Sequence, residues 1–211
     1  MMRNLTPLRV GGIALALLWP FVFRPLAHLL PLAVIPRTML LDVVVLGIML
    51  LILRAERIDV RAIGLRWPSW RDPLWAIGIA IVGLVFYMVF QRFLPGTGSQ
   101  LASILSGINL FVAIPFVLIV GVTEELTFRG YLIGVAASNV GLPVAFVVST
   151  LVFGFAHATV YGLNATLLAP LGLGAVLAGF YVWRRNLTAC ILGHALIDYV
   201  GLVSLAAAHA H

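Results

Sequence analysis

The sequence of 211 residues contains no lysine and few charged residues of any kind. Only 9% of its residues are charged, whereas 63% are hydrophobic, and an ordinary soluble domain has roughly 25% charged residues. Together with a mean hydropathy of +1.14, this predicts an integral, multi-pass membrane protein. The apolar segments follow one another through short connections, which leave no room for a soluble domain.

Cysteine is almost absent as well. The single Cys190 lies in an apolar run, which excludes a disulfide framework and a thiolate metal site. Cys190 is four residues from His194 but has no other recognisable partner, and no serine stands near a matching motif. The zinc-protease motif HExxH is also missing. Serine, cysteine and HExxH-type zinc proteases are therefore not indicated.

Seven apolar segments are long enough to be membrane helices, given that about 20 residues cross roughly 30 Å of hydrocarbon. They cover about residues 10–32, 37–53, 74–94, 107–137, 142–161, 163–182 and 187–208. The predicted fold class is all-α: a polytopic transmembrane bundle of about seven helices, with its active site within the membrane. Residues 1–107 would supply N-terminal helices and a loop, and residues 108–208 the catalytic core, within one integrated membrane domain.

The net charge of +6 comes entirely from arginines. They gather near the N-terminus, at Arg184 and Arg185, and above all in the polar connection 54–73, which carries five arginines and two tryptophans. Such loop clusters mark the cytoplasmic side, so we interpret them as topology signals and expect no nucleic-acid partner. The N-terminus would then lie inside and the C-terminus outside, with Arg92 as the exception. The all-arginine composition favours a bacterial cytoplasmic membrane.

Acidic residues are scarce, and their positions are informative. Three of the seven lie within candidate membrane helices, together with two histidines. Ionisable groups inside a membrane are costly and are by default functional candidates. These buried candidates are Glu124, Glu125, His157, His194 and Asp198, whereas Asp42 is expected near a helix end and Glu56, Asp59 and Asp72 in loops.

Helical spacing separates the two adjacent glutamates. Glu125 and Arg129 are four residues apart, in the order that favours an ion pair on one helix face. Glu124 points about 140° away from Arg129. We therefore expect Glu125 to pair with Arg129 in a structural role, leaving Glu124 for another partner.

Depth in the membrane suggests that partner. If the chain turns near residues 139–142, Glu124 and His157 both lie about 23 Å from the turn and can face each other. Phe153, four residues before His157, shares its helix face, as Asp198 does with His194. By the same count His194 is expected about 10 Å shallower than Glu124.

Three motifs in these helices resemble those of one family. EELTFR, FGFAH and HALID are similar to the EExxxR, FxxxH and HxxxN or HxxxD patterns of the CPBP family, which comprises the CAAX prenyl endopeptidases and their bacterial Abi-type relatives. The resemblance covers about residues 108–205 and implies a glutamate-dependent intramembrane endopeptidase.

The resemblance also implies roles for the motif residues. Glu124 and His157 would activate the water, and His194 with Asp198 would stabilise the oxyanion or order the site. Many members have Asn where this chain has Asp198. An aspartate donates a hydrogen bond only when protonated, so we expect Asp198 to orient His194. Phe153 joins Glu125 and Arg129 as structural support.

Two alternatives remain open at this stage. Glu, His, His and Asp are all ligands for divalent metals, so the same residues could form a zinc-dependent protease site, although the expectation is that no cofactor is needed. A transporter or immunity protein could use the acid and histidine as a proton relay. The expected partners are the lipid bilayer and a membrane-associated protein or peptide substrate, with or without a lipid group.

Overall fold

The computed structural model describes residues 6–93, 109–158, 163 and 165–208. This part of the chain is helical and contains no β-strand. Its elements, in chain order, are α1 (Pro7–Ala27), α2 (Val34–Ala55), α3 (Asp72–Phe93), α5 (Leu110–Glu125), the π-helix η1 (Leu126–Ile133), α6 (Ala137–Val140), α7 (Leu142–Ala156), the 3₁₀ turn η2 (Ala165–Leu167), α9 (Leu168–Arg184) and α10 (Leu187–Ala208).

The predicted fold class is confirmed, with changes in helix bounds. Each of the seven predicted segments contains a helix, and within the residues that the structure describes six helices are long and apolar enough to cross a membrane. The remaining predicted segment, 142–161, forms α7, which is shorter and stops at Ala156. The predicted bound of 161 is therefore wrong. The first helix ends at Ala27 rather than at 32. Pro31 follows four residues later, and helices usually end at or before the residue that precedes a proline.

Local sequence signals explain where several helices begin and end. Thr6 caps α1 by accepting a hydrogen bond from the Arg9 amide (3.2 Å), and a proline follows at the first helical position, where its missing donor costs nothing. Gly141, with φ of 86°, turns the chain into α7. Arg185 ends α9 in the left-handed conformation with φ of 48°, which makes the α9–α10 connection tight.

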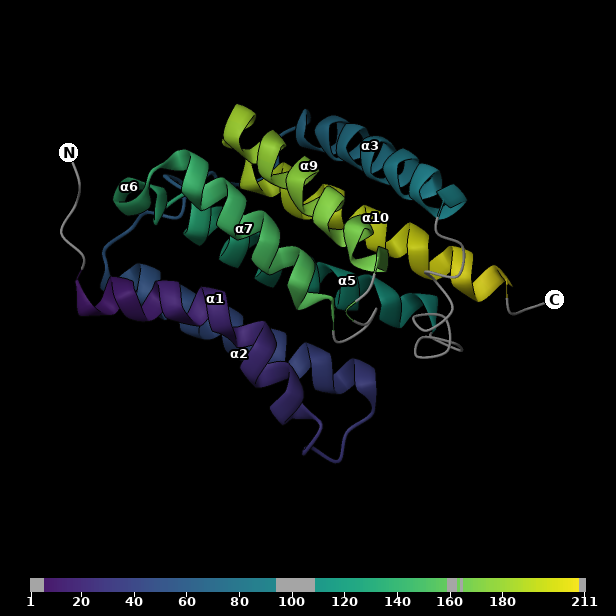
Figure 1. Cartoon of the computed structure of the whole chain (residues 1–211), viewed down its shortest axis with the longest axis horizontal. Coiled ribbons are helices and arrows are strands. Elements are labelled where there is room, and N and C mark those ends of the chain that lie inside the picture. Colours follow the sequence, from purple (N-terminus) through teal and green to yellow (C-terminus); the bar gives the residue numbers. More distant parts are fainter. Residues whose placement is uncertain (1–5, 94–108, 159–162, 164, 209–211) are drawn as a thin grey trace.

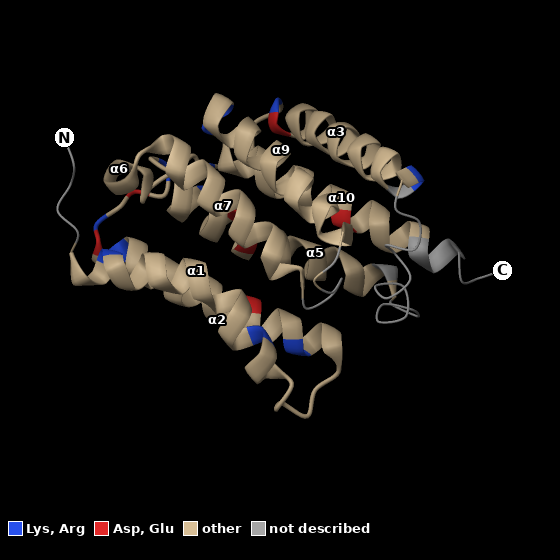
Figure 2. Ribbon diagram, in the orientation of Figure 1, with Lys and Arg blue, Asp and Glu red and all other residues tan. Residues whose placement is uncertain are grey.

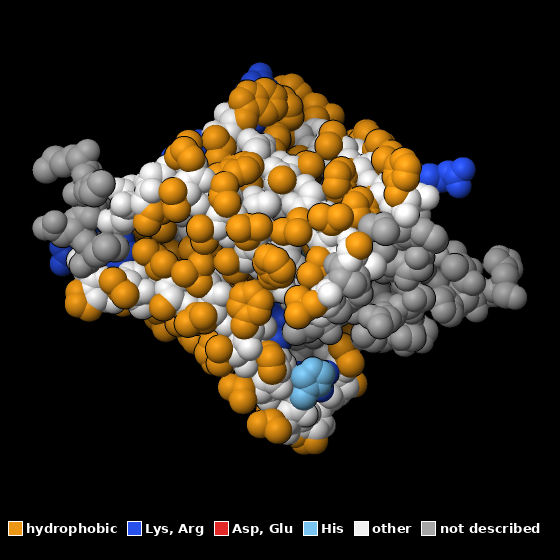
Figure 3. Space-filling view, viewed as in Figure 1, with side chains coloured by type: hydrophobic (Ala, Val, Ile, Leu, Met, Phe, Trp, Pro, Cys, Tyr) orange, Lys and Arg blue, Asp and Glu red, His pale blue; other side chains and the backbone are white. Residues whose placement is uncertain are grey.

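Helix α5 packs against α10 and α2 and positions the candidate site. Helix α10 packs along both α3 and α5, α7 packs against α9, and α1 pairs with α2, as Figure 1 shows. Acidic positions occur on α5 and α10 in the middle of the bundle (Figure 2). The visible outer face is dominated by hydrophobic side chains (Figure 3), as expected for helices that contact lipid.

The predicted helix 107–137 is not one regular helix. After Glu125 the chain continues as an eight-residue π-helix whose residues are all buried. Hydrogen bonds that skip five residues, such as Gly134 N to Arg129 O (2.9 Å), continue this geometry. Ser149 Oγ from α7 donates to the Phe128 carbonyl (2.8 Å). π-Helical turns are rare in proteins, and those that occur are often found at functional sites. The change to π geometry directly after the two glutamates therefore marks this position as a candidate site.

Candidate active site

Glu124 and Glu125 occupy the last turn of α5, where the helix changes to π geometry. Both side chains are buried, with relative exposures of 1% and 0%. Because they are consecutive, they leave the helix in different directions and meet different partners. Each has one carboxylate oxygen, Oε2, that receives no hydrogen bond from the described residues.

Glu125 forms the predicted ion pair. Its Oε1 accepts from Arg129 Nη1 at 2.7 Å, and both side chains are completely buried. Arg129 also donates through Nη2 to the Gly174 carbonyl of α9 (3.0 Å), and its guanidinium carbon lies 4.3 Å from the centre of the Phe153 ring. The pair thus ties α5 and η1 to α9 and α7.

Glu124 forms an ion pair that the sequence analysis did not predict. Its Oε1 accepts from Arg24 Nη2 of α1 at 2.5 Å. Arg24 also donates through Nη1 to the Ala156 carbonyl (3.1 Å) and lies over the Trp19 ring at 5.0 Å. The first helix, outside the three motifs, therefore contributes a cation to the site.

His157 lies where the depth argument placed it, at the end of α7 and within electrostatic reach of Glu124. Its Nδ1 is 2.8 Å from the Phe153 carbonyl, which can only accept, so Nδ1 carries a hydrogen. In the neutral ring Nε2 is then an acceptor. The Phe153 ring lies 4.9 Å from the imidazole, which agrees with the shared helix face inferred from FGFAH.

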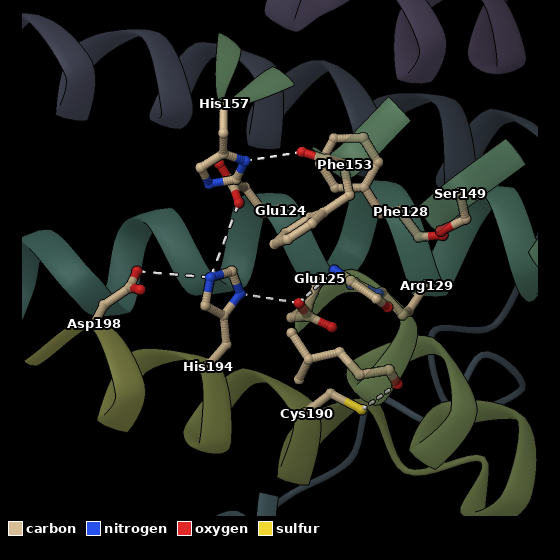
Figure 4. Close-up of polar contacts among 12 residues, drawn as sticks. Glu124, Glu125, Phe128, Arg129, Ser149, Phe153, His157, Cys190, His194 and Asp198 are labelled. Carbon is tan, nitrogen blue, oxygen red and sulfur yellow. Dashed lines mark hydrogen bonds and ion pairs between the residues drawn. The ribbon is translucent and has the colours of Figure 1, made fainter. Parts of the chain in front are cut away.

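His194 is surrounded by carboxylates, as Figure 4 shows. Its Nδ1 lies 2.9 Å from Glu125 Oε1. Its Nε2 lies 3.6 Å from Asp198 Oδ2 and 3.9 Å from Glu124 Oε2. The expected offset of 10 Å between His194 and Glu124 is therefore wrong. Counting residues assumes that all helices begin at the same depth and run without tilt. The packing of α10 against α5 instead brings His194 to the level of Glu124.

All four predicted catalytic residues thus lie around one centre. Glu124 is in contact with His194 and electrostatically coupled to His157, and Asp198 reaches His194. Phe153 lies beside both imidazoles, with its ring centre 5.6 Å from that of His194. Asp198 is the most exposed of these acids, with 33% of its side chain accessible.

Two residues at the site were missed by the sequence analysis, Arg24 and Asp42. Asp42 is not near a helix end, because α2 begins at Val34 and holds it inside the membrane segment, 1% exposed. The available signal was Arg24 itself, a cation within an apolar helix that requires a buried counter-ion. Spacing along one helix could not identify that counter-ion.

The arrangement limits how a metal could bind. Among residues 6–93, 109–158, 163 and 165–208, no three His, Cys, Asp or Glu side chains are grouped so that they could hold a metal ion. Arginines occupy one oxygen of each glutamate, and a divalent cation would compete with them for these carboxylates.

Comparison with known proteins identifies a matching family. Residues 105–200 match the model of a protein family described as Type II CAAX prenyl endopeptidase Rce1-like. No curated protein and no solved structure matches the chain. The matched range contains every described element from α5 to α9 and the motif-bearing part of α10, but not Arg24 or Asp42.

Proposed function

We propose that the chain, whose residues 105–200 match the Rce1-like family of type II CAAX prenyl endopeptidases, hydrolyses a peptide bond with water activated by Glu124. The family implies a membrane protease that acts on a peptide or protein. The finer mechanism rests on the geometry around Glu124.

One observation carries the proposal: the two oxygens of Glu124 are in different situations. Oε1 is held by Arg24 at 2.5 Å, whereas Oε2 is buried without a hydrogen bond from the described residues and lies 3.9 Å from His194 Nε2. A buried carboxylate oxygen without a donor is suited to accept a proton from water. General bases must lie within hydrogen-bond reach of the proton they remove.

The proposed reaction has two proton transfers. Glu124 Oε2 takes a proton from water while the water oxygen bonds to the carbonyl carbon, and the carbonyl electron pair moves to its oxygen. When this tetrahedral intermediate collapses, the carbon–nitrogen bond breaks and the amine leaves with a proton. Glu124 supplies that proton, with His157 sharing it during the exchange. His194, held between Glu125 and Asp198, orients Glu124 and offers positive charge to the developing oxyanion.

The substrate we propose is a membrane-associated protein with a prenylated CAAX terminus. The family description names this class, and a site formed by the ends of α5 and α7 and the middle of α10 suits a peptide delivered from the bilayer. A fluorescence-quenched CAAX peptide, with and without a farnesyl group on its cysteine, distinguishes lipid recognition from cleavage of any membrane peptide.

The test of the mechanism combines chelation with substitution. Purified protein should cleave the farnesylated peptide after exhaustive chelation, and Glu124→Gln should fold but lose about 10² to 10⁴ in rate, the usual contribution of a proton-transfer group. Activity lost on chelation and restored by zinc would establish the metal alternative. Full activity of Glu124→Gln would overturn the proposal.

We also propose that the 54–73 connection faces the cytoplasm of a bacterial cell, with the N-terminus inside. Support comes from its arginines and from exposed Trp67 and Trp70, at 89% and 74%, which fit an interfacial position. Reporter fusions at residue 60 should be active on the cytoplasmic side. A periplasmic signal from the same fusion contradicts this orientation.

A further inference from the structure

Asp42 is a buried carboxylate that the mechanism above does not use. It is 1% exposed, and neither of its carboxylate oxygens has a hydrogen-bond partner among the described residues. Leaving a buried carboxylate without partners is costly. Such a group in a folded protein calls for an explanation, and one explanation is a role in a second state of the site.

The position of Asp42 connects it to Glu124. The Thr123 hydroxyl, adjacent to Glu124 in α5, donates to the Asp42 backbone carbonyl at 3.1 Å, so this turn of α2 packs directly against the end of α5. Asp42 also lies within electrostatic reach of both Arg24 and Glu124. Three charged side chains from α1, α2 and α5 therefore form one cluster, which we call the Arg24 cluster: Arg24, Asp42 and Glu124.

The Arg24 cluster contains two carboxylates and one guanidinium. In the structure the Arg24 guanidinium is bound to Glu124, and it donates no hydrogen bond to the Asp42 carboxylate. When Glu124 accepts a proton from water it becomes neutral, and its attraction for Arg24 falls. Because most of the Arg24 side chain is shielded from solvent, with 16% of it accessible, its guanidinium is then stabilised by another anion nearby.

We propose that Asp42 is a positioning residue that receives Arg24 when Glu124 becomes protonated. This inference rests on the proposed function of Glu124 as the general base. Arg24 stays bound to Glu124 while that carboxylate is charged, and moves toward Asp42 as the charge disappears. Asp42 thereby stabilises the protonated state of Glu124 through Arg24, and neither Asp42 nor Arg24 exchanges a proton with substrate.

The proposal is tested by a double-mutant cycle on the full chain in nanodiscs, with the farnesylated CAAX peptide as probe. Asp42→Asn should fold, since it removes an unpaired charge, and should lower kcat about 10- to 100-fold with KM changed less than about 3-fold. Asp42→Glu, which keeps the charge, should restore part of kcat. Asp59→Asn, in the exposed loop, serves as the matched control and should leave kcat unchanged.

The cycle separates action through Arg24 from a direct or structural role. In an Arg24→Gln background, Asp42→Asn should change kcat by less than about 2-fold, because the residue through which Asp42 acts is gone. A wild-type kcat for Asp42→Asn, or an equally large loss in both backgrounds, overturns the proposal. If Asp42→Asn does not fold, a kcat for Asp42→Glu no higher than that of Arg24→Gln also overturns it.

An activity-independent measurement completes the test. Arg24→Gln should lower Tm, because it leaves two carboxylates together, and adding Asp42→Asn should raise Tm again by removing one of them. Additive, uncoupled Tm changes contradict the cluster. Glu124→Gln in the same assay reports on the proposed function separately: if it is fully active, the general base is wrong, whatever Asp42 does.

Discussion

Glu125 and Glu124 are neighbours in the chain, yet their two sides of α5 are built differently. Glu125 is paired with Arg129, four residues away in the next turn, and neither side chain is exposed. Glu124 is paired with Arg24, 100 residues away on α1, and Arg24 keeps 16% of its side chain accessible. The first pair is local and closed, whereas the second joins separate helices at a partly open position.

The difference suggests a division of roles between structure and chemistry. Around Glu125, Arg129 and His194 both contact the same oxygen, at 2.7 and 2.9 Å, and Arg129 is anchored to another helix. Around Glu124, the arginine comes from an outer helix and a second acceptor, Asp42, lies nearby. A group that must change protonation during turnover is better served by the second arrangement, because its counter-ion can move.

The largest expected effect is on the Glu125 side. Glu125→Ala leaves the buried Arg129 without its carboxylate, which should cost about 3 to 5 kcal/mol and reduce the folded protein in the membrane. The measurement is Tm and detergent-resistant yield, with the charge exchange Glu125→Arg and Arg129→Glu expected to restore part of the loss. Normal folding with complete loss of activity would mean that Glu125 takes part in the chemistry.

A smaller effect is expected on the Glu124 side. Arg24→Gln leaves Glu124 Oε1 without its charged donor, at a cost of about 1 to 3 kcal/mol, less than at Arg129 because water can reach the partly exposed position. The matched variant is Arg129→Gln, measured by Tm in the same membrane mimic. An equal fall in Tm for the two variants would show that the Glu124 and Glu125 pairs do not differ in how strongly they stabilise the protein.

These two pairs also show what the sequence can and cannot predict. The Glu125–Arg129 pair follows from spacing on one helix, and the meeting of Glu124 with His157 follows from equal depth around a short turn. Arg24 could be recognised as a cation that needs a partner, but several acids were candidates. Choosing among them requires the packing of α1 against η1 and α7, which hydropathy does not determine.

The π-helix and the depth of His194 could not be predicted from the sequence, for a related reason. Nothing in LTFRGYLI distinguishes π from α geometry, since the change depends on how tertiary contacts satisfy widened turns, as Ser149 does for the Phe128 carbonyl. His194 was placed at the wrong depth because helix tilt is set by neighbouring helices rather than by residue count. The sequence pattern identifies the motif residues, but the packing of the helices determines the distances between them.

Phe153 lies between the two sides, and its substitution should have a smaller effect than the loss of Glu125 or Arg24. Its ring contacts His157, His194, Phe128 and the Arg129 guanidinium. Phe153→Leu keeps an apolar side chain but loses these aromatic and cation contacts, which are worth about 1 to 2 kcal/mol together. Tm should fall accordingly, while Phe155→Leu, one of the lipid-side positions at 43% exposure, should change it little. A similar shift in both would show that the ring contacts contribute nothing specific.

The smallest effect is expected for a third arginine–carboxylate pair, far from the glutamates. Arg66 lies 3.4 Å from Asp72, and its side chain is 54% exposed while that of Asp72 is buried. Asp72 differs from Glu125 and Glu124 because it has further donors: Asn186 Nδ2 at 2.6 Å and the Ser69 amide and hydroxyl at 2.6 and 2.8 Å.

The stability lost when an arginine is removed should depend on its burial and on the other donors to its carboxylate. On that basis the Arg66–Asp72 pair should show the smallest loss of the three pairs. Arg66→Ala should cost no more than about 1 kcal/mol, as exposed ion pairs do. Asn186→Ala is the matched variant and should cost more, about 1 to 2 kcal/mol, because Asn186 also accepts from the Ala189 amide at the start of α10 (3.1 Å). Both are measured as changes in Tm beside Arg24→Gln. A loss for Arg66→Ala as large as that for Arg24→Gln would mean that charge alone, and not the number of other donors to the carboxylate, decides what each arginine contributes.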